Sequence, residues 1–237
     1  MKEYIFLIIA TLISLFSHGQ TDLAIINDPD GYVNIRVDKN ADSEIITTLK
    51  EGDLFLCEPT NDNWWKVDNF HSQTGFVQKS RIILIKNKSD NDQREMIIKS
   101  MEGLKNYRQK YDSLRSILPN DQRLELLREF ENFEETVYTP LLTFLSGLFC
   151  KNKDVDLLDK FLVVIVANQM SANESPAWTL GECYLCYPDL ILQKIDKYKG
   201  KNKEYLKNTL IFGFENITLN KENEIKDYQR LKVKLNE

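Results

Sequence analysis

Few residues in this chain could act as a nucleophile or bind a transition metal. The cysteines and histidines are Cys57, Cys150, Cys183, Cys186, His18 and His71. Cysteine and serine peptidases need a histidine base beside the nucleophile, and a catalytic zinc site usually takes three protein ligands. The composition therefore argues against both classes of enzyme. We predict no catalytic residue, no bound metal and no cofactor.

The pair Cys183 and Cys186 has the spacing of a redox motif or of half a zinc site. Thioredoxin-like sites place the first cysteine at a helix N-terminus, which lowers its pKa. Cys183 instead lies well inside a helix expected to start near Pro176. The sequence has no second pair to complete a four-ligand zinc site. Buried thiols are the favoured interpretation, and a structural disulfide with Cys150 is the alternative in an oxidising compartment.

Carboxylates could cleave glycans without histidine or cysteine. Glu174 and Ser175 resemble the Glu-Ser pair of lytic transglycosylases, in which a glutamate with a raised pKa acts as general acid. The segment 176–181 lacks the Gly-rich element of those enzymes. We therefore interpret Glu174 as a loop residue beside a helix cap and keep the carboxylate-only enzyme as an alternative. A solvated helix face is predicted for the acidic cluster Glu125, Glu129, Glu131, Glu134 and Glu135.

The segment 23–85 has the pattern of a small all-β unit, because short apolar or alternating runs are separated by turn residues. The runs expected to form strands are residues 23–26, 32–37, 45–49, 54–57, 64–67, 75–77 and 80–85. In 32–37 apolar side chains alternate with polar ones, so one face can be buried. A unit of about 60 residues builds only a small core. Phe55 and Trp65 are the candidate large side chains for it.

Four landmarks in this segment resemble a bacterial SH3-like (SH3b) domain. They are Asp30-Gly31-Tyr32-Val33-Asn34-Ile35-Arg36, the turn Lys50-Glu51-Gly52-Asp53, Trp64-Trp65-Lys66-Val67 and Gly75-Phe76-Val77. The landmarks keep their order along residues 22–87. The resemblance implies a small, strongly bent β-barrel. For many relatives it also implies noncatalytic binding to cell-wall peptides or other extracytoplasmic ligands.

A barrel of this kind binds extended peptides through exposed aromatic side chains flanked by polar loops. Alternation could place Tyr32, Trp64 and Phe76 outward, and Asp28 and Asp30 could pair with a peptide amine. These five are the predicted ligand-binding residues. The alternative is structural, with Trp64 covering one end of the barrel and Phe76 filling the core, as its pattern favours.

Beyond residue 88 the apolar spacing becomes helical. Residues 89–237 are expected to form an all-α domain, an antiparallel helical array built as a globular bundle or an α-α superhelix. Its first helix, capped by Ser89 or Asp90, carries the apolar stripe Ile97, Met101, Leu104, Tyr107, Tyr111, Leu114 and Leu118. Asp154 is the predicted cap of another helix. The later helices are expected at residues 121–138, 140–150, 155–170, 175–187, from 188, 202–217 and 222–235.

The N-terminus has the order of a secretory signal. Lys2 precedes the apolar run Tyr4–Phe16, and small residues follow up to Gly19. A spanning helix needs about 20 apolar residues, so this run is too short. We predict a signal peptide over residues 1–19 and a secreted or periplasmic protein, with a retained anchor or a buried strand as the alternative. No cysteine lies near Gly19 for lipid attachment.

The formal net charge of −5 argues against nucleic acid as a partner, because nucleic-acid-binding faces are strongly basic. Cleavage near Gly19 would leave His71 as the only histidine, inside the β unit. We predict an exported noncatalytic binding or scaffolding protein. Its SH3-like domain would bind cell-wall peptide or another envelope ligand, and its helical domain would mediate protein interaction, without stable membrane insertion. The alternatives are a peptidoglycan-active enzyme and an envelope protein that neutralises one specific partner.

Overall fold

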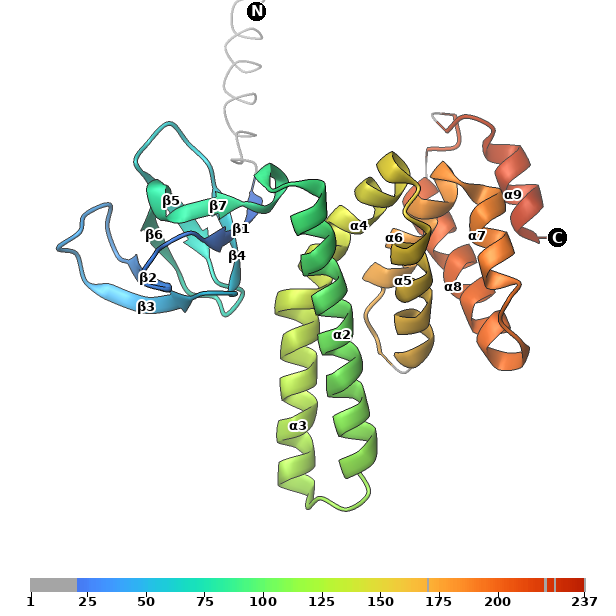
Figure 1. The fold of residues 1–237 in the computed structure, drawn as a ribbon, viewed down its shortest axis with the longest axis horizontal. Coiled ribbons are helices and arrows are strands. Elements are labelled where there is room, and N and C mark those ends of the chain that lie inside the picture. Colours follow the sequence, from blue (N-terminus) through green and yellow to red (C-terminus); the bar gives the residue numbers. More distant parts are fainter. Residues whose placement is uncertain (1–20, 170, 220, 224, 237) are drawn as a thin grey trace, which may run out of the picture. The chain divides into compact units, whose positions relative to one another are not determined.

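The computed structural model describes residues 21–169, 171–219, 221–223 and 225–236. The predicted signal peptide, residues 1–19, lies outside these ranges. The chain divides into two compact units between Lys88 and Ser89 (Figure 1). The first is built from strands and the second from helices, which confirms the β-plus-α fold class. Within the described ranges, no helix is both long enough and apolar enough to cross a membrane.

The first unit is one antiparallel sheet. Its strands are β1 (Asp22–Ile26), β2 (Tyr32–Arg36), β3 (Ile45–Lys50), β4 (Leu54–Glu58), β5 (Trp64–Asp68), β6 (Thr74–Gln78) and β7 (Ile82–Leu84). The strand order is β3-β2-β6-β5-β4-β1-β7. Among the described residues, β3 and β7 end the sheet and do not pair with each other. The sheet is therefore open, and the expected barrel is not confirmed.

The core of this unit covers one face of the sheet. Inward positions of the strands are buried, among them Val33 and Val77, because apolar and polar residues alternate. Phe55 is fully buried, as predicted. Trp65 is only partly buried against the core, and its Nε1–H donates to the carbonyl oxygen of Thr60 at 3.0 Å. That hydrogen bond holds the polar edge of the indole at the periphery of the core.

The second unit is helical. It contains α2 (Asp90–Leu114), α3 (Asn120–Phe133), α4 (Thr139–Asn152), α5 (Val155–Ala167), α6 (Ser175–Cys186), α7 (Pro188–Ile195), α8 (Gly200–Thr218) and α9 (Tyr228–Asn236). Two predicted caps are confirmed. The Ser89 hydroxyl accepts from the N–H of Asp92 at 3.1 Å, and the Asp154 carboxylate accepts from the N–H of Leu157 at 3.0 Å.

Two helix boundaries differ from the prediction by four residues or more. The first helix ends at Leu114 rather than at Leu118. The residue before a proline disfavours helical backbone angles, so the chain leaves the helix before it reaches Pro119. The last helix begins at Tyr228 rather than near Glu222. Asp227 has a φ of 61°, and a right-handed helix cannot pass through that conformation.

A π turn, Glu134–Tyr138, joins α3 to α4 without a loop. The N–H of Thr139 donates to the carbonyl of Glu134, five residues earlier. The sequence predicts a break before Pro140, but the helical run is continuous and widens there instead. Pro140 has no N–H, and its ring crowds the carbonyl four residues earlier, so a wider turn relieves that contact.

A disulfide joins Cys150 of α4 to Cys186 of α6, with Cα atoms 5.6 Å apart. The favoured interpretation of buried thiols is therefore wrong for Cys186, and the alternative, a disulfide with Cys150, is confirmed. The favoured interpretation is right for Cys183, which is free and buried, as Cys57 also is. The two helices pack side by side, and this brings residues that are 36 positions apart within bridging distance.

Two glycines allow α6 and α8 to cross closely. A Cβ on Gly213 would overlap the carbonyl oxygen of Ala177, and one on Gly181 would lie 2.7 Å from the carbonyl carbon of Gly213. Beside this crossing, Phe214 is fully buried and meets the ring of Tyr184 edge-on, with centroids 5.6 Å apart. The crossing fixes the position of α8, which lines a cavity described below.

Candidate functional site

The three aromatic residues predicted to bind ligand lie on one face of neighbouring strands. The register pairs Trp64 with Gln78, and Phe76 with Arg36. Paired residues share a face, and so do residues two or four apart on one strand. Tyr32, Trp64 and Phe76 therefore project from the face of the β2-β6-β5 region opposite the core.

Two of these aromatic side chains, Tyr32 and Trp64, have different surroundings. Tyr32, at the start of β2, is 48 % exposed. Trp64 is half-buried and lines a small cavity of about 100 Å³ together with Arg36 and Arg81. This part of the face combines an aromatic ring with guanidinium groups, which suits a ligand that carries both apolar and anionic groups.

Phe76 is half-buried on the outer face rather than in the core. The alternation of β6 places Gly75 and Val77 inward instead. The ammonium group of Lys39 lies 5.5 Å from the centre of the Phe76 ring, in a cation–π contact. The favoured interpretation, that Phe76 fills the core, is therefore wrong.

Asp28 and Asp30 shape the turn that precedes β2. The Asp28 side chain is 5 % exposed and contacts Nη1 of Arg81 at 2.7 Å. Its Oδ1 also accepts from the N–H of Asp30 at 2.9 Å. Asp28 is thus already paired with a cation, whereas Asp30 is exposed and open to a ligand amine.

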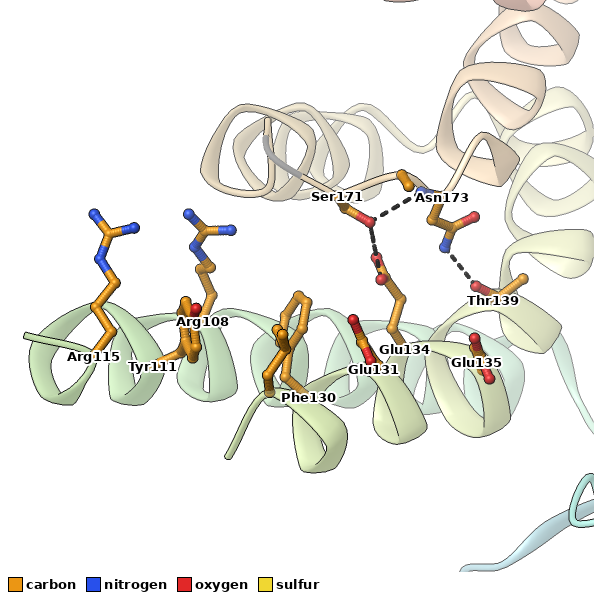
Figure 2. A pocket seen from close by; sticks show the side chains of 12 residues that line it. Arg108, Tyr111, Arg115, Phe130, Glu131, Glu134, Glu135, Thr139, Ser171 and Asn173 are labelled. Atoms are coloured by element: carbon orange, nitrogen blue, oxygen red, sulfur yellow. Dashed lines mark hydrogen bonds between the residues drawn. The ribbon is translucent and has the colours of Figure 1, made fainter. Parts of the chain in front are cut away.

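A second candidate site surrounds Glu134 in the helical unit (Figure 2). Glu134 is 6 % exposed. The Ser171 hydroxyl donates to its carboxylate, and the hydroxyl oxygen lies 2.9 Å from each carboxylate oxygen. Asn173 donates to the hydroxyl of Thr139 at 2.7 Å, which ties the loop before α6 to the start of α4. The predicted solvated face is therefore wrong for Glu134. It is confirmed for Glu125, Glu129, Glu131 and Glu135.

The spacing of the buried residues along α3 and the π turn explains how a glutamate enters the interior. Leu126, Phe130, Glu134 and Tyr138 recur at four-residue intervals, and all are buried. On an ideal α-helix this spacing drifts by about 40° per step. The π turn takes up part of that drift and keeps Tyr138 inward. A charged residue within an apolar stripe was the signal in the sequence that could have identified this site.

Two adjoining cavities meet at this glutamate. The residues that line both are Glu134, Ser171, Ala172 and Asn173. The larger cavity has a volume of about 580 Å³. Figure 2 shows Arg108, Arg115 and Tyr111 at one end of it, the glutamates at the other, and Phe130 between them. The larger cavity is therefore positive at one end and negative at the other.

The smaller cavity, about 270 Å³, has largely apolar walls that include Leu104 and Phe212. Tyr138 and Asn168 are buried residues beside this cavity, and one polar atom of each, Tyr138 Oη and Asn168 Oδ1, has no hydrogen-bond partner among the described residues. Leaving a buried polar atom unpaired costs about 1–3 kcal/mol, so such atoms are rare. They mark positions where polar groups of a ligand could bind.

The electrostatics of this site favour a cation. Burial raises the pKa of the Glu134 carboxyl; hydrogen bonds from Ser171 and Asn173 oppose that shift, and the nearby carboxylates of Glu135 and Glu131 add to it. A positive group next to Glu134 would reverse the effect, because an opposite charge stabilises the ionised carboxylate.

The residues considered for catalysis have surroundings that do not suit it. Burial raises the pKa of the Cys57 thiol to about 12 and also raises that of Cys183. Such thiols are protonated at neutral pH and are poor nucleophiles. Glu174 lies exposed at the N-cap of α6, and His71 is exposed in the first unit. These four described residues supply neither a reactive thiolate nor a shielded general acid.

A scan against models of known protein families finds no match, and a search of curated proteins finds none either. The β unit offers a row of aromatic and basic side chains on a sheet face. The helical unit offers two cavities around one buried carboxyl.

Proposed function

We propose that this protein is an exported, noncatalytic binding protein whose β unit binds extended peptides of the cell envelope. The observation that carries this proposal is that Tyr32, Trp64 and Phe76 project from one face of neighbouring strands. Exposed aromatic rings beside polar groups form binding surfaces for extended peptides. Arg36 and Lys66 are paired with Phe76 on the same face, where they suit peptide carboxylates.

The finer assignment of the β unit, a bacterial SH3-like domain, is part of the proposal. Its support is the order of the landmarks, from the strand with Arg36 through the Gly52 turn to Gly75. Gly52 has a φ of 92°, which favours glycine. A Cβ on Gly75 would lie 2.5 Å from the carbonyl oxygen of Arg36, so glycine allows β6 to approach β2.

The disulfide Cys150–Cys186 supports export, because disulfides persist in oxidising compartments and are rare in the cytosol. It agrees with the predicted signal peptide. We further propose that the helical unit mediates protein interaction as an antiparallel array, in which α2 packs against α3, α4 and α5, and α6 packs against α4 and α8.

Isothermal titration of the full chain with soluble cell-wall peptides tests the proposal. Trp64→Ala is expected to weaken binding about tenfold, since buried aromatic contacts dominate such interfaces. Trp178→Ala is the matched control, because it removes an indole that is 42 % exposed in the helical unit. Equal affinity of the Trp64 variant and the wild type would refute the proposal, and so would equal losses in both variants.

Carboxylate-only glycan cleavage is a second candidate function, and one observation favours it. The buried Glu134 has a raised pKa and shares the larger cavity with Glu131 and Glu135. A glutamate with a raised pKa beside a second carboxyl group is the usual machinery of glycosidases. If the protein cleared a turbid peptidoglycan suspension, Glu134→Gln would abolish clearing and Glu174→Gln would not. The binding proposal expects no clearing by the wild type.

A further inference from the structure

The cavities around Glu134 have a polarity that defines the chemistry of a ligand. We propose that they bind a small ω-amino acid, in which a primary ammonium group is joined to a carboxylate by a short aliphatic chain. The ammonium group binds in the smaller cavity, and the carboxylate binds at the arginine end of the larger one. This site is separate from the aromatic face of the β unit.

Oxygen atoms supply the ammonium end. The Glu134 carboxylate, Tyr138 Oη and Asn168 Oδ1 all belong to residues that line the smaller cavity, and the last two atoms lack partners among the described residues. The amide of Asn168 is oriented by its Nδ2, which donates to the carbonyl of Val164 at 3.0 Å and leaves Oδ1 as an acceptor. An ammonium group has three N–H donors. It would satisfy both orphaned atoms and pair with the buried carboxylate.

The rest of the smaller cavity suits an aliphatic chain. Apolar side chains of α2, α5, α6 and α8 form much of its wall, namely Leu104, Val164, Ile165, Ala177 and Phe212, and Glu174, Asn208 and Thr209 add polar groups to it. Methylene groups gain from burial against the apolar part of this wall. The site therefore favours a ligand whose polar groups are confined to its ends.

Guanidinium groups supply the carboxylate end. Nε of Arg108 contacts Asp112 at 2.8 Å, and Nε of Arg115 contacts the same residue at 3.6 Å. One carboxylate is thus shared by two cations, which leaves positive charge for a ligand. In Figure 2 both guanidinium groups point toward the side of the cavity where Ser171 lies.

The helix geometry sets the length of the ligand. Leu104 lines the smaller cavity and Arg108 lines the larger one, and both belong to α2. Four residues of an α-helix rise by about 6 Å. An α-amino acid, with its two charges on adjacent carbons, is too short to bridge that separation. Glu131 and Glu135 at the other end of the larger cavity repel a carboxylate and so fix the direction of binding.

Titration calorimetry of the full chain with three probes tests the proposal. ε-Aminocaproate carries both end groups, hexylamine only the amine, and caproate only the carboxylate. We expect ε-aminocaproate to bind, hexylamine to bind about tenfold more weakly, and caproate not to bind. Caproate binding as tightly as ε-aminocaproate would overturn the proposal, and so would heats of dilution alone for all three probes.

Variants assign each end. Glu134→Gln should weaken ε-aminocaproate binding at least tenfold, whereas Glu125→Gln, an exposed glutamate on the same helix, should have no effect. Arg108→Gln should weaken binding of ε-aminocaproate and leave that of hexylamine unchanged. Equal losses for both probes would contradict the assigned direction.

Tyr138→Phe separates binding from folding. The Tyr138 hydroxyl has no partner among the described residues, so its removal should weaken binding several-fold without lowering the Tm of the ligand-free protein. A lower Tm with unchanged affinity would show that the hydroxyl has a structural role instead. Peptide binding by the β unit is measured by the Trp64 variant, so it can succeed or fail independently of this site.

Discussion

At the scale of single residues, the arrangement around Glu134 shows how a charged group is held in an apolar interior. The π turn places this side chain inward, and the Ser171 hydroxyl gives its carboxylate one hydrogen bond. The hydrogen bonds from Ser171 and Asn173 offset only part of the lost hydration, so burial raises the pKa of the carboxyl. The residue therefore links folding to pH.

Glu134 should make the folded state less stable as the pH rises. Its folded-state pKa lies above the ordinary value of 4.5, so the native state binds this proton more tightly than the unfolded state does. Its stabilising contribution is fully present below the unfolded pKa and is lost as the pH rises through the folded pKa. We expect Glu134→Gln to lose less stability than the wild type over this window. Urea midpoints at a series of pH values measure the difference, and parallel curves would contradict the raised pKa.

At the scale of elements, local signals predicted where strands and helices form. The strand alternation in residues 32–37 and the helix caps Ser89 and Asp154 each depend on residues only a few positions apart. They can therefore be recognised directly in the sequence. Contacts between distant segments left no such signal. The loop with Ser171 meets Glu134 only because α4, α5 and α6 pack together. For this reason the aromatic face could be predicted from the sequence, whereas the only signal for the cavities was a glutamate among the apolar residues of one helical stripe.

The close crossing of α6 and α8 should be highly sensitive to added volume. Gly213→Ala would push a methyl group into the backbone of Ala177, which cannot move as a side chain can. We expect a loss of about 3 kcal/mol or more in the free energy of unfolding. Gly147→Ala is the matched control in α4, since nothing described lies within 4 Å of its Cβ position. That variant should be neutral or more stable by up to about 1 kcal/mol, the helix-propensity difference. Similar urea midpoints for the two variants would contradict the close approach of α6 and α8 at Gly213.

At the scale of the whole molecule, the compartment in which the chain folds decides whether the disulfide forms. The disulfide constrains the segment from α4 to α6, which includes Ser171 and Asn173 of the Glu134 site. Export would therefore affect the site as well as the location of the protein. The β unit contains no bridge, because its one cysteine, Cys57, is a buried thiol.

Reduction should destabilise the helical unit. A crosslink between residues 36 positions apart is worth about 4 kcal/mol in the chain-entropy model. We expect the wild type to unfold at a lower urea concentration in the presence of a reductant. The double variant Cys150→Ser with Cys186→Ser should unfold at that lower concentration in either condition. A wild-type midpoint that does not respond to reductant, with complete reduction verified by mass spectrometry, would contradict a stabilising bridge.

The central claim is that the outer face of the β unit binds peptide, and the indole N–H signals of the three tryptophans test it in one NMR titration. Soluble cell-wall peptides are added to the full chain, and the Nε1–H shifts of Trp64, Trp65 and Trp178 are followed. The account predicts a large, saturable shift for Trp64, which lines the outer cavity, a smaller one for Trp65, whose N–H is bonded to Thr60, and none for Trp178 in the helical unit. An unmoved Trp64 signal at saturating peptide, or a shift confined to Trp178, would contradict it.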